Sequence, residues 1–305
     1  MGRLDRAFDI LLTRVSPPPT QMEAARRSHN ALRQYLLNDP YFGGMIHTTF
    51  LNGSYARNTV IRPIKDVDII VVVARDWLSA TPAAAMESLR RKLAQRYDQR
   101  RTLRQRRAVR VTLFDMQLDV LLGVTDGPED RPLRIPDRNQ DRWILTHPRM
   151  QLGLTSRLGQ LTGGNYSRLV RLAKHWCNTR VAGRDQPSSF VLECATYHVI
   201  HSRPAAYAGA LSNAFATLLG DLHEWDFGRA EKLFRWGSPQ VPDPALPDVN
   251  VAERWSAASA DRVRSRLDVA VRRRDEVGRC RWEETALAKW RSILGEPFPG
   301  ATAVR

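Results

Sequence analysis

The most constraining feature of this chain is an unbroken run of β-branched residues that follows two closely spaced carboxylates. Residues 66–73 read Asp-Val-Asp-Ile-Ile-Val-Val-Val. Such a continuous apolar run is typical of a strand that is buried on both faces of a sheet. Because side chains at positions i and i+2 of a strand point the same way, Asp66 and Asp68 are expected to project together from one face, while Val67 and Ile69 enter the core.

Two carboxylates on one strand face require a counter-charge. At a separation of a few ångström they repel each other and favour a shared proton or a bound cation. Oxygen ligands at the edge of a rigid sheet suit Mg²⁺, which usually takes one or two carboxylates and completes its shell with substrate phosphates. Taken alone, Asp-Val-Asp is more often a solvated strand end that carries two acids than a metal site.

Two further features favour the cation. Gly53 and Ser54 are predicted to form a turn, in which backbone N–H groups and the Ser54 hydroxyl can approach a polyphosphate. Asp119 lies inside an expected strand at 117–124, where an acid is costly to bury unless a cation or another partner offsets its charge. Asp115 is the competing acid, but it lies in the expected hairpin turn, so we interpret it as structural.

The order Gly-Ser, Asp-x-Asp and a later lone Asp resembles the signature of the polymerase-β-like nucleotidyltransferases. More narrowly, GSYARNTVIRPIKDVDIIVVV is similar to the pattern of the CD-NTase family, the bacterial relatives of cyclic GMP-AMP synthase and oligoadenylate synthase that make cyclic oligonucleotides in anti-phage signalling. The resemblance covers roughly residues 4–290 and includes the segments IPDRNQDRWILTHPR, LVRLAKHWCN, PSSFVLECATYHVI and VPDPALPDVNVAERW.

The resemblance implies an α+β fold with two lobes and an active site in the cleft. Residues 1–147 would form the polymerase-β-like nucleotidyltransferase core, a small mixed sheet with flanking helices that include the N-terminal ones. Residues 148–305 would form an all-α, oligoadenylate-synthase-like domain. The sequence pattern agrees, because strand signals vanish after Thr146.

Helical and strand patterns place the elements along the chain. A loop is expected at 125–142, which the resemblance makes a wall of the nucleotide pocket. Strands are expected at 46–51, 69–73, 110–113 and 117–124. Helices are expected at 4–15, 20–38, 79–97, 148–161, 165–180, 187–202, 204–219, 228–236, 248–274 and 282–293.

The resemblance also implies the chemistry, which is nucleotidyl transfer between nucleoside triphosphates with release of pyrophosphate. Asp66, Asp68 and Asp119 would be both the catalytic residues and the ligands of two Mg²⁺ ions, with Mn²⁺ as the alternative metal. A second round of transfer on the linear intermediate would close a cyclic di- or trinucleotide. Gly53 and Ser54 would position the phosphates of the donor.

The same resemblance implies that two residues of the helical part contact the phosphates of the donor. Lys174 stands off the apolar helix face that includes Leu172 and Trp176, and a helix lysine in such a position is more often simply exposed. LVRLAKHW matches the place where family members put a lysine on the donor triphosphate. Ser189 lies at an expected helix start, where a hydroxyl caps the helix and an anion is favoured.

The charge of the chain bears on its partners. The chain has 47 Lys and Arg against 32 Asp and Glu, which gives a net charge of +15. Such a charge suits polyanionic ligands, namely nucleoside triphosphates, RNA or DNA. A GC-rich genome also enriches Arg, so the charge has a second explanation. The segment Arg90–Arg110 holds ten Lys or Arg and one acid. We interpret it either as a solvated helix end and hairpin tip or as a groove for an activating RNA or DNA. The family further implies an operon-encoded effector or regulator.

Composition excludes a membrane protein and favours a cytoplasmic one. No apolar run approaches the ~18 residues of a membrane span. The N-terminal stretch carries Asp5 and Asp9, so we do not interpret it as a signal peptide. The three cysteines have no metal-site spacing and are expected to be reduced thiols.

Two classes of alternative remain open at this stage. The same metal site could serve linear oligonucleotide synthesis or nucleotidyl transfer to RNA or protein. The chain could also be an inactive homologue that binds nucleic acid. Base specificity, linkage and ring size cannot be assigned to any residue of the sequence.

Overall fold

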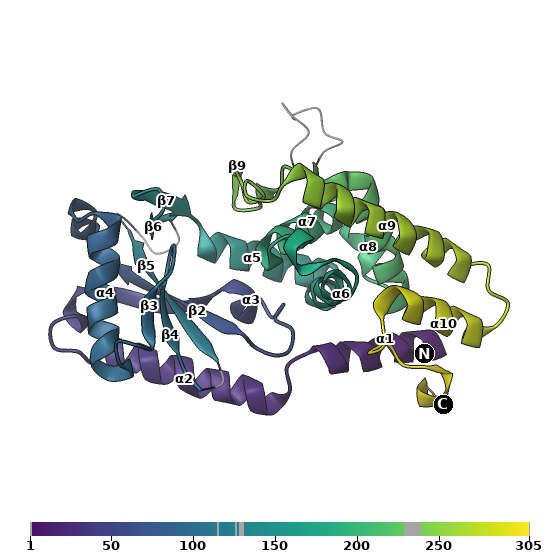
Figure 1. The fold of residues 1–305 in the computed structure, drawn as a ribbon, viewed down its shortest axis with the longest axis horizontal. Coiled ribbons are helices and arrows are strands. Elements are labelled where there is room, and N and C mark those ends of the chain that lie inside the picture. The colour runs from purple at the N-terminus through teal and green to yellow at the C-terminus, as the bar shows by residue number, and fades with distance from the viewer. Residues whose placement is uncertain (1, 115, 126, 128–130, 229–238, 305) are drawn as a thin grey trace. The chain divides into compact units, whose positions relative to one another are not determined.

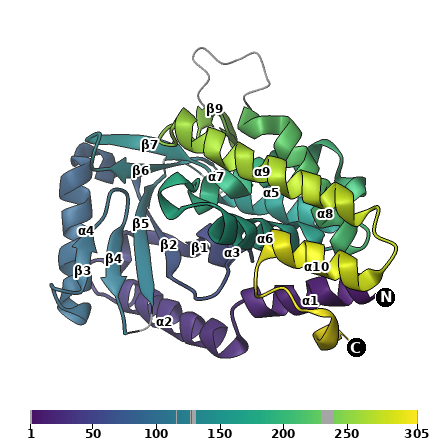
Figure 2. The same cartoon turned by 45° about the vertical axis from the view of Figure 1, so that its right-hand side comes forward.

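The computed structural model describes residues 2–114, 116–125, 127, 131–228 and 239–304 (Figures 1 and 2). The chain forms two compact units, each with its own hydrophobic core. The sheet unit is Pro17–Leu152, and the helical unit joins Met1–Ser16 to Gly153–Arg305. This arrangement confirms the predicted α+β fold class.

The sheet unit contains a seven-stranded mixed sheet in the order β1-β2-β5-β4-β3, with β6 and β7 attached at β5. Strands β2 and β5 run parallel, and the other pairs are antiparallel. The strands are β1 Ile46–Asn52, β2 Asp66–Val73, β3 Thr102–Arg104, β4 Val109–Thr112, β5 Gln117–Val124, β6 Leu133–Asp137 and β7 Arg142–Thr146.

Helices cover one face of this sheet. They are α2 Pro19–Leu37 and α4 Pro82–Tyr97, and the unit also contains the short helices η1 Gly43–Met45, α3 Gly53–Ala56 and η2 Arg75–Ser79. The odd-numbered residues of β2, Val67–Val73, are fully buried in one cluster with Leu32 of α2 and Leu89 of α4. Thr81 caps the start of α4, because its hydroxyl accepts a hydrogen bond from Ala84 N–H.

The opposite face of β2 begins with the two acids. Ile70 and Val72 on this face pack with Leu133 of β6 in a small cluster of their own. Asp66 and Asp68 share the parity of these residues, so they project from the face that α2 and α4 leave free. The prediction that both acids lie on one face, with Val67 and Ile69 in the core, is confirmed.

The helical unit packs its helices around a large apolar cluster. Its helices are α1 Arg3–Val15, α5 Pro148–Leu161, which crosses the unit boundary, α6 Asn165–Arg180, η3 Gly183–Asp185, α7 Ser189–Ser202, η4 Pro204–Tyr207, α8 Leu211–Trp225, η5 Asp226–Gly228, α9 Ala257–Val277, α10 Glu283–Leu294 and η6 Ala301–Val304. A two-stranded sheet, β8 Pro242–Asp243 with β9 Leu246–Asn250, completes it. None of the helices in the described part of the chain is long and apolar enough to cross a membrane.

The N-terminal helix belongs to this helical unit, whereas the sequence predicted it in the core with residues 1–147. Phe8 of α1 is fully buried, and its ring lies 5.0 Å from that of Trp290, 5.3 Å from that of Phe298 and 5.9 Å from that of Phe215. These partners come from the last hundred residues of the chain, so a local pattern could not reveal them.

Several predicted elements differ in the structure. The expected loop at 125–142 contains β6 and the start of β7, and the expected helix at 248–274 begins only at Ala257 because β9 precedes it. The expected helix at 204–219 is divided between η4 and α8. The expected helix at 228–236 falls almost entirely outside the described residues, and so does Asp115. All three cysteines are free thiols, as predicted.

The packing of α1 generates a stability prediction. We expect Phe8→Ala to lower the free energy of unfolding of the helical unit by about 3–5 kcal/mol, because it removes a buried ring and leaves a cavity among three aromatic partners. Trp282→Ala is the matched control, since this aromatic side chain is exposed. Urea unfolding followed by circular dichroism measures both, and equal losses in the two variants would contradict the placement of α1.

Candidate functional site

One line of the sheet carries four polar side chains on four neighbouring strands. Strand register pairs Asn52 of β1 with Asp68 of β2, Asp68 with Asp119 of β5, and Asp119 with Arg110 of β4. Paired residues on adjacent strands point to the same face of a sheet. We call the three acids Asp66, Asp68 and Asp119 the carboxylate row. Asp66 lies two residues before Asp68 on the same face.

The acids of the row repel one another. The pKa of Asp68 is raised to about 7, mainly by burial and in addition by the neighbouring carboxylates of Asp66 and Asp119, against a lowering by Arg57 and Arg110. A buried carboxyl group with acidic neighbours holds its proton to near neutral pH unless a cation offsets the charge. The three predicted acids therefore do occupy one patch of the sheet.

Asp119 also has a partner that the sequence analysis did not anticipate. Arg110 Nε donates to Asp119 Oδ1 at 2.7 Å, and Arg110 Nη2 donates to Oδ2 at 2.6 Å. The three acids thus lie on the strand positions that the predicted pair of Mg²⁺ ions requires. The Asp119 carboxylate, however, points to Arg110 and not toward such a pair. Counting across the predicted three-residue turn would have paired Asp119 with Val111. The observed register instead pairs Thr112 with Gln117 and therefore Arg110 with Asp119.

Gly53 is fitted tightly against the row. Its backbone has a φ of +68°, and a Cβ atom at this position would lie 1.8 Å from Asp68 Oδ2. Only glycine adopts this conformation readily and leaves room for the carboxylate. Gly53 and Ser54 begin the short helix α3, in place of the predicted turn, and follow Asn52 directly.

The donor set fits a divalent cation. Carboxylate oxygens are the ligands that Mg²⁺ prefers, and the crowding that raises the pKa of Asp68 is the kind that a cation relieves. Within the described residues, however, no three His, Cys, Asp or Glu side chains already surround a common ion position. We attribute this to Asp119, whose carboxylate points to Arg110.

The two residues of the helical unit that were predicted to contact phosphate lie in different surroundings. Lys174 is buried, contrary to the usual state of a helix lysine, and its Nζ lies 3.2 Å from Oε2 of the buried Glu193 on α7. Ser189 is exposed at the first position of α7. The hydroxyl that caps this helix is that of Ser188, which accepts from Val191 N–H at 3.2 Å, so the predicted capping role of Ser189 is wrong.

Acids of the sheet unit neutralise much of the basic segment Arg90–Arg110. Six of its ten cations form ion pairs: Arg90 and Arg104 with Glu87, Lys92 with Asp39, Arg106 and Arg107 with Asp137, and Arg110 with Asp119. The segment therefore attracts polyanions less strongly than its composition indicates. Asp137, in the expected pocket wall, is fully buried between two arginines of this segment.

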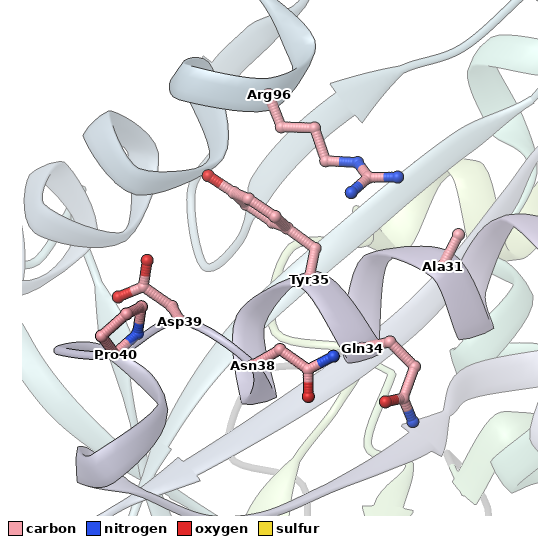
Figure 3. A pocket seen from close by; sticks show the side chains of 7 residues that line it. All are labelled: Ala31, Gln34, Tyr35, Asn38, Asp39, Pro40 and Arg96. Carbon is pink, nitrogen blue, oxygen red and sulfur yellow. The ribbon is translucent and has the colours of Figure 1, made fainter.

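A pocket of about 420 Å³ lies beside α2 and α4, on the helix-covered side of the sheet unit (Figure 3). Arg96 reaches over the ring of Tyr35, with its guanidinium carbon 5.1 Å from the ring centroid. The pocket is lined by Ala31, Gln34, Tyr35, Asn38, Asp39, Pro40 and Arg96. Because none of the predicted site residues lines it, we assign it no part in the chemistry of the carboxylate row.

The close fit of Gly53 generates a prediction. We expect Gly53→Ala to destabilise the sheet unit by about 1–3 kcal/mol, since alanine is strained at this φ, and to push the Asp68 carboxylate out of place. Binding of Mn²⁺, measured by electron paramagnetic resonance, should weaken correspondingly. Gly44→Ala is the control, because a Cβ atom there meets nothing within 4 Å. Equal stability and equal Mn²⁺ affinity of Gly53→Ala and Gly44→Ala would contradict the close fit of Gly53 against Asp68.

The raised pKa of Asp68 predicts a pH dependence of stability. A carboxyl group with a raised pKa in the folded state contributes stability that is complete below the unfolded pKa of about 4. That contribution is lost as the pH rises through the folded pKa of about 7. In EDTA, we therefore expect the melting temperature of Asp68→Asn to exceed that of the wild type by an amount that grows from about pH 5 to about pH 8.

Asp76→Asn, a change at an exposed acid just after β2, is the control and should follow the wild type at every pH. Added Mg²⁺ should stabilise the wild type and leave Asp68→Asn largely unaffected. If the difference in melting temperature between the wild type and Asp68→Asn stayed constant across this pH range, the raised pKa assigned to Asp68 would be ruled out.

Comparisons with known proteins agree with this geometry. Residues 3–156, about half of the chain, match the family model of the second messenger oligonucleotide or dinucleotide synthetase domain. A cyclic AMP-AMP-AMP synthase of an Acinetobacter species is 28% identical over 304 residues, which cover 96% of this chain and 84% of that protein.

Solved structures share the fold along nearly the whole chain. Escherichia coli MS115-1 CdnC, solved with ATP, has a TM-score of 0.77 at 17% identity and covers 95% of this chain and 98% of its own. The same protein in a CdnC:HORMA-deltaN complex has a TM-score of 0.75 at 18% identity, with 94% and 95% covered. With the matching family model, these findings show that the chain belongs to the CD-NTase family of second messenger oligonucleotide or dinucleotide synthetases.

Proposed function

We propose that this chain joins nucleoside triphosphates, with release of pyrophosphate, into a cyclic di- or trinucleotide, and that Asp66, Asp68 and Asp119 are its catalytic residues. The observation that carries the proposal is the carboxylate row, in which acids from two parallel strands crowd on the sheet face opposite to α2 and α4. The cyclic product is supported by the relative named cyclic AMP-AMP-AMP synthase.

The three aspartates would hold two Mg²⁺ ions, or Mn²⁺. When bound, such a pair of ions stabilises both the attacking oxygen and the leaving group of an in-line displacement. In the reaction, the acceptor ribose hydroxyl forms a bond to the α-phosphorus of the donor, and the bond from that phosphorus to the bridging oxygen breaks. Pyrophosphate leaves with the electron pair, and the hydroxyl proton passes to a carboxylate oxygen of Asp119.

Other residues would position the donor. The backbone amide that follows Gly53 and the Ser54 hydroxyl, beside Asp68, are suited to phosphate oxygens, because Gly53 has no side chain to shield them. Lys174 and Ser189 join the proposal by family resemblance. For Lys174 this role requires that its ammonium group serve phosphate as well as Glu193. Positioning of this kind supplies much of the catalysis in phosphoryl transfer.

We also propose partners and a location. A protein regulator is supported by the CdnC:HORMA-deltaN complex of the E. coli relative. An activating RNA or DNA on Arg90–Arg110 stays a prediction, which the ion pairs of that segment weaken. A role in anti-phage signalling follows from the family. Free thiols are consistent with the cytoplasm.

The test is a screen for products. The purified protein is incubated with labelled ATP, GTP, CTP and UTP and Mg²⁺, the products are treated with phosphatase, and resistant ones are identified by mass. We expect a phosphatase-resistant cyclic oligonucleotide from the wild type and none from the double variant Asp66→Asn with Asp68→Asn. The loss should exceed about a thousandfold, since both acids that would hold the ions are removed.

Asp76→Asn serves as the matched control and should retain full turnover. A ladder of phosphatase-sensitive products would show that the enzyme makes linear oligonucleotides and would overturn the assignment of a cyclic product. Unchanged turnover in the double variant would overturn the assignment of Asp66 and Asp68. A wild type without any product, but with affinity for nucleic acid, would indicate an inactive homologue.

A further inference from the structure

The ion pair between Arg110 and Asp119 has no part in the chemistry proposed above. The guanidinium bonds both oxygens of the carboxylate, at 2.7 and 2.6 Å. This fork-to-fork geometry is directional and assisted by charge, which makes it one of the stronger side-chain pairs in proteins. It engages the same two oxygens that a divalent cation would bind.

The backbone on both sides of the pair is fixed. Arg110 lies between Val109 and Val111, and Asp119 between Leu118 and Val120, and all four neighbours are fully buried. The two residues are register partners on antiparallel strands. Separation of the pair must therefore come from rotation of side chains, and the Arg110 side chain, 27% exposed, has room to rotate toward solvent.

Arg110 acts on the whole carboxylate row. Its positive charge lowers the pKa of Asp68, and the charges of Asp66 and Asp68 in turn raise the pKa of Arg110, after the larger effect of its hydrogen bond to Asp119. The guanidinium thus reduces the negative potential that attracts a divalent cation to this face of the sheet.

We propose that Arg110 is a positioning residue that competes with divalent cations for Asp119, so that a cation reaches this carboxylate only after the guanidinium has left at least one of its oxygens. Arg110 thereby sets the cation affinity of the site. The inference rests on the proposed function, because it takes Asp119 as a metal ligand. A purely structural role, in which Arg110 only holds Asp119 in its liganding orientation, predicts the opposite effect on affinity.

The experiment measures Mn²⁺ binding without nucleotide, by electron paramagnetic resonance titration of the full chain. We expect Arg110→Gln to bind Mn²⁺ at least about tenfold more tightly than the wild type, because a unit positive charge a few ångström from the ion, at an effective dielectric constant of about 20, opposes binding by more than that factor. Arg104→Gln is the matched control. It removes the same charge from the adjacent strand β3, where the partner is Glu87, and should leave the affinity unchanged.

Arg110→Lys retains the charge but cannot form the fork, so its affinity should lie between those of Arg110→Gln and the wild type. If circular dichroism shows that Arg110→Gln does not fold, Arg110→Lys tests the inference instead, and it should bind Mn²⁺ more tightly than the wild type. Unchanged or weaker Mn²⁺ binding in the folded variant, beside normal binding by the wild type, would overturn the inference and leave the proposed function intact. No Mn²⁺ binding by the wild type or any variant would overturn both.

Discussion

Mutual repulsion of carboxylates on a rigid sheet is the physical constraint around which the sheet unit is built. Asp68 and Asp119 are register partners on parallel strands whose flanking residues are fully buried, so their backbones cannot move apart. Burial of Asp68, together with the negative charges of Asp66 and Asp119 beside it, raises the pKa of Asp68 to about 7. Such a cost is common at functional sites and rare elsewhere, because nothing in the packing of the sheet requires acids there.

The surroundings of the row moderate this repulsion without removing it. Arg110 pairs with Asp119, and Arg57 acts on Asp68. Gly53 brings the backbone of α3 against the Asp68 carboxylate, at a distance that any side chain would prevent. These contacts surround the acids on one face of β2, while α2 and α4 close the other face with apolar side chains. The apolar face of this strand serves stability, and the acidic face carries the proposed chemistry.

The parts of the fold that local pattern could predict are those in which local and tertiary preferences agree. The run from Ile69 to Val73 has the composition of a buried strand and is one. By contrast, β6 contains Pro136 and the acid Asp137, which favour a loop, and it is a strand because Arg106 and Arg107 pair with that acid from a distant part of the chain. Ser188, rather than Ser189, caps α7, which shows that the exact end of a helix depends on tertiary context.

The sequence by itself determined that Asp66 and Asp68 stand on one face of β2 and the apolar Val67 between them on the other, because the two-residue period of a strand is a local property. Only the tertiary structure decided which charged side chains form ion pairs and which helices pack together. The ion pair of Lys92 with Asp39, the burial of Lys174 against Glu193 and the packing of α1 with the C-terminal helices all depend on contacts between distant segments. Such contacts form when strands and helices pack, and no local pattern encodes them.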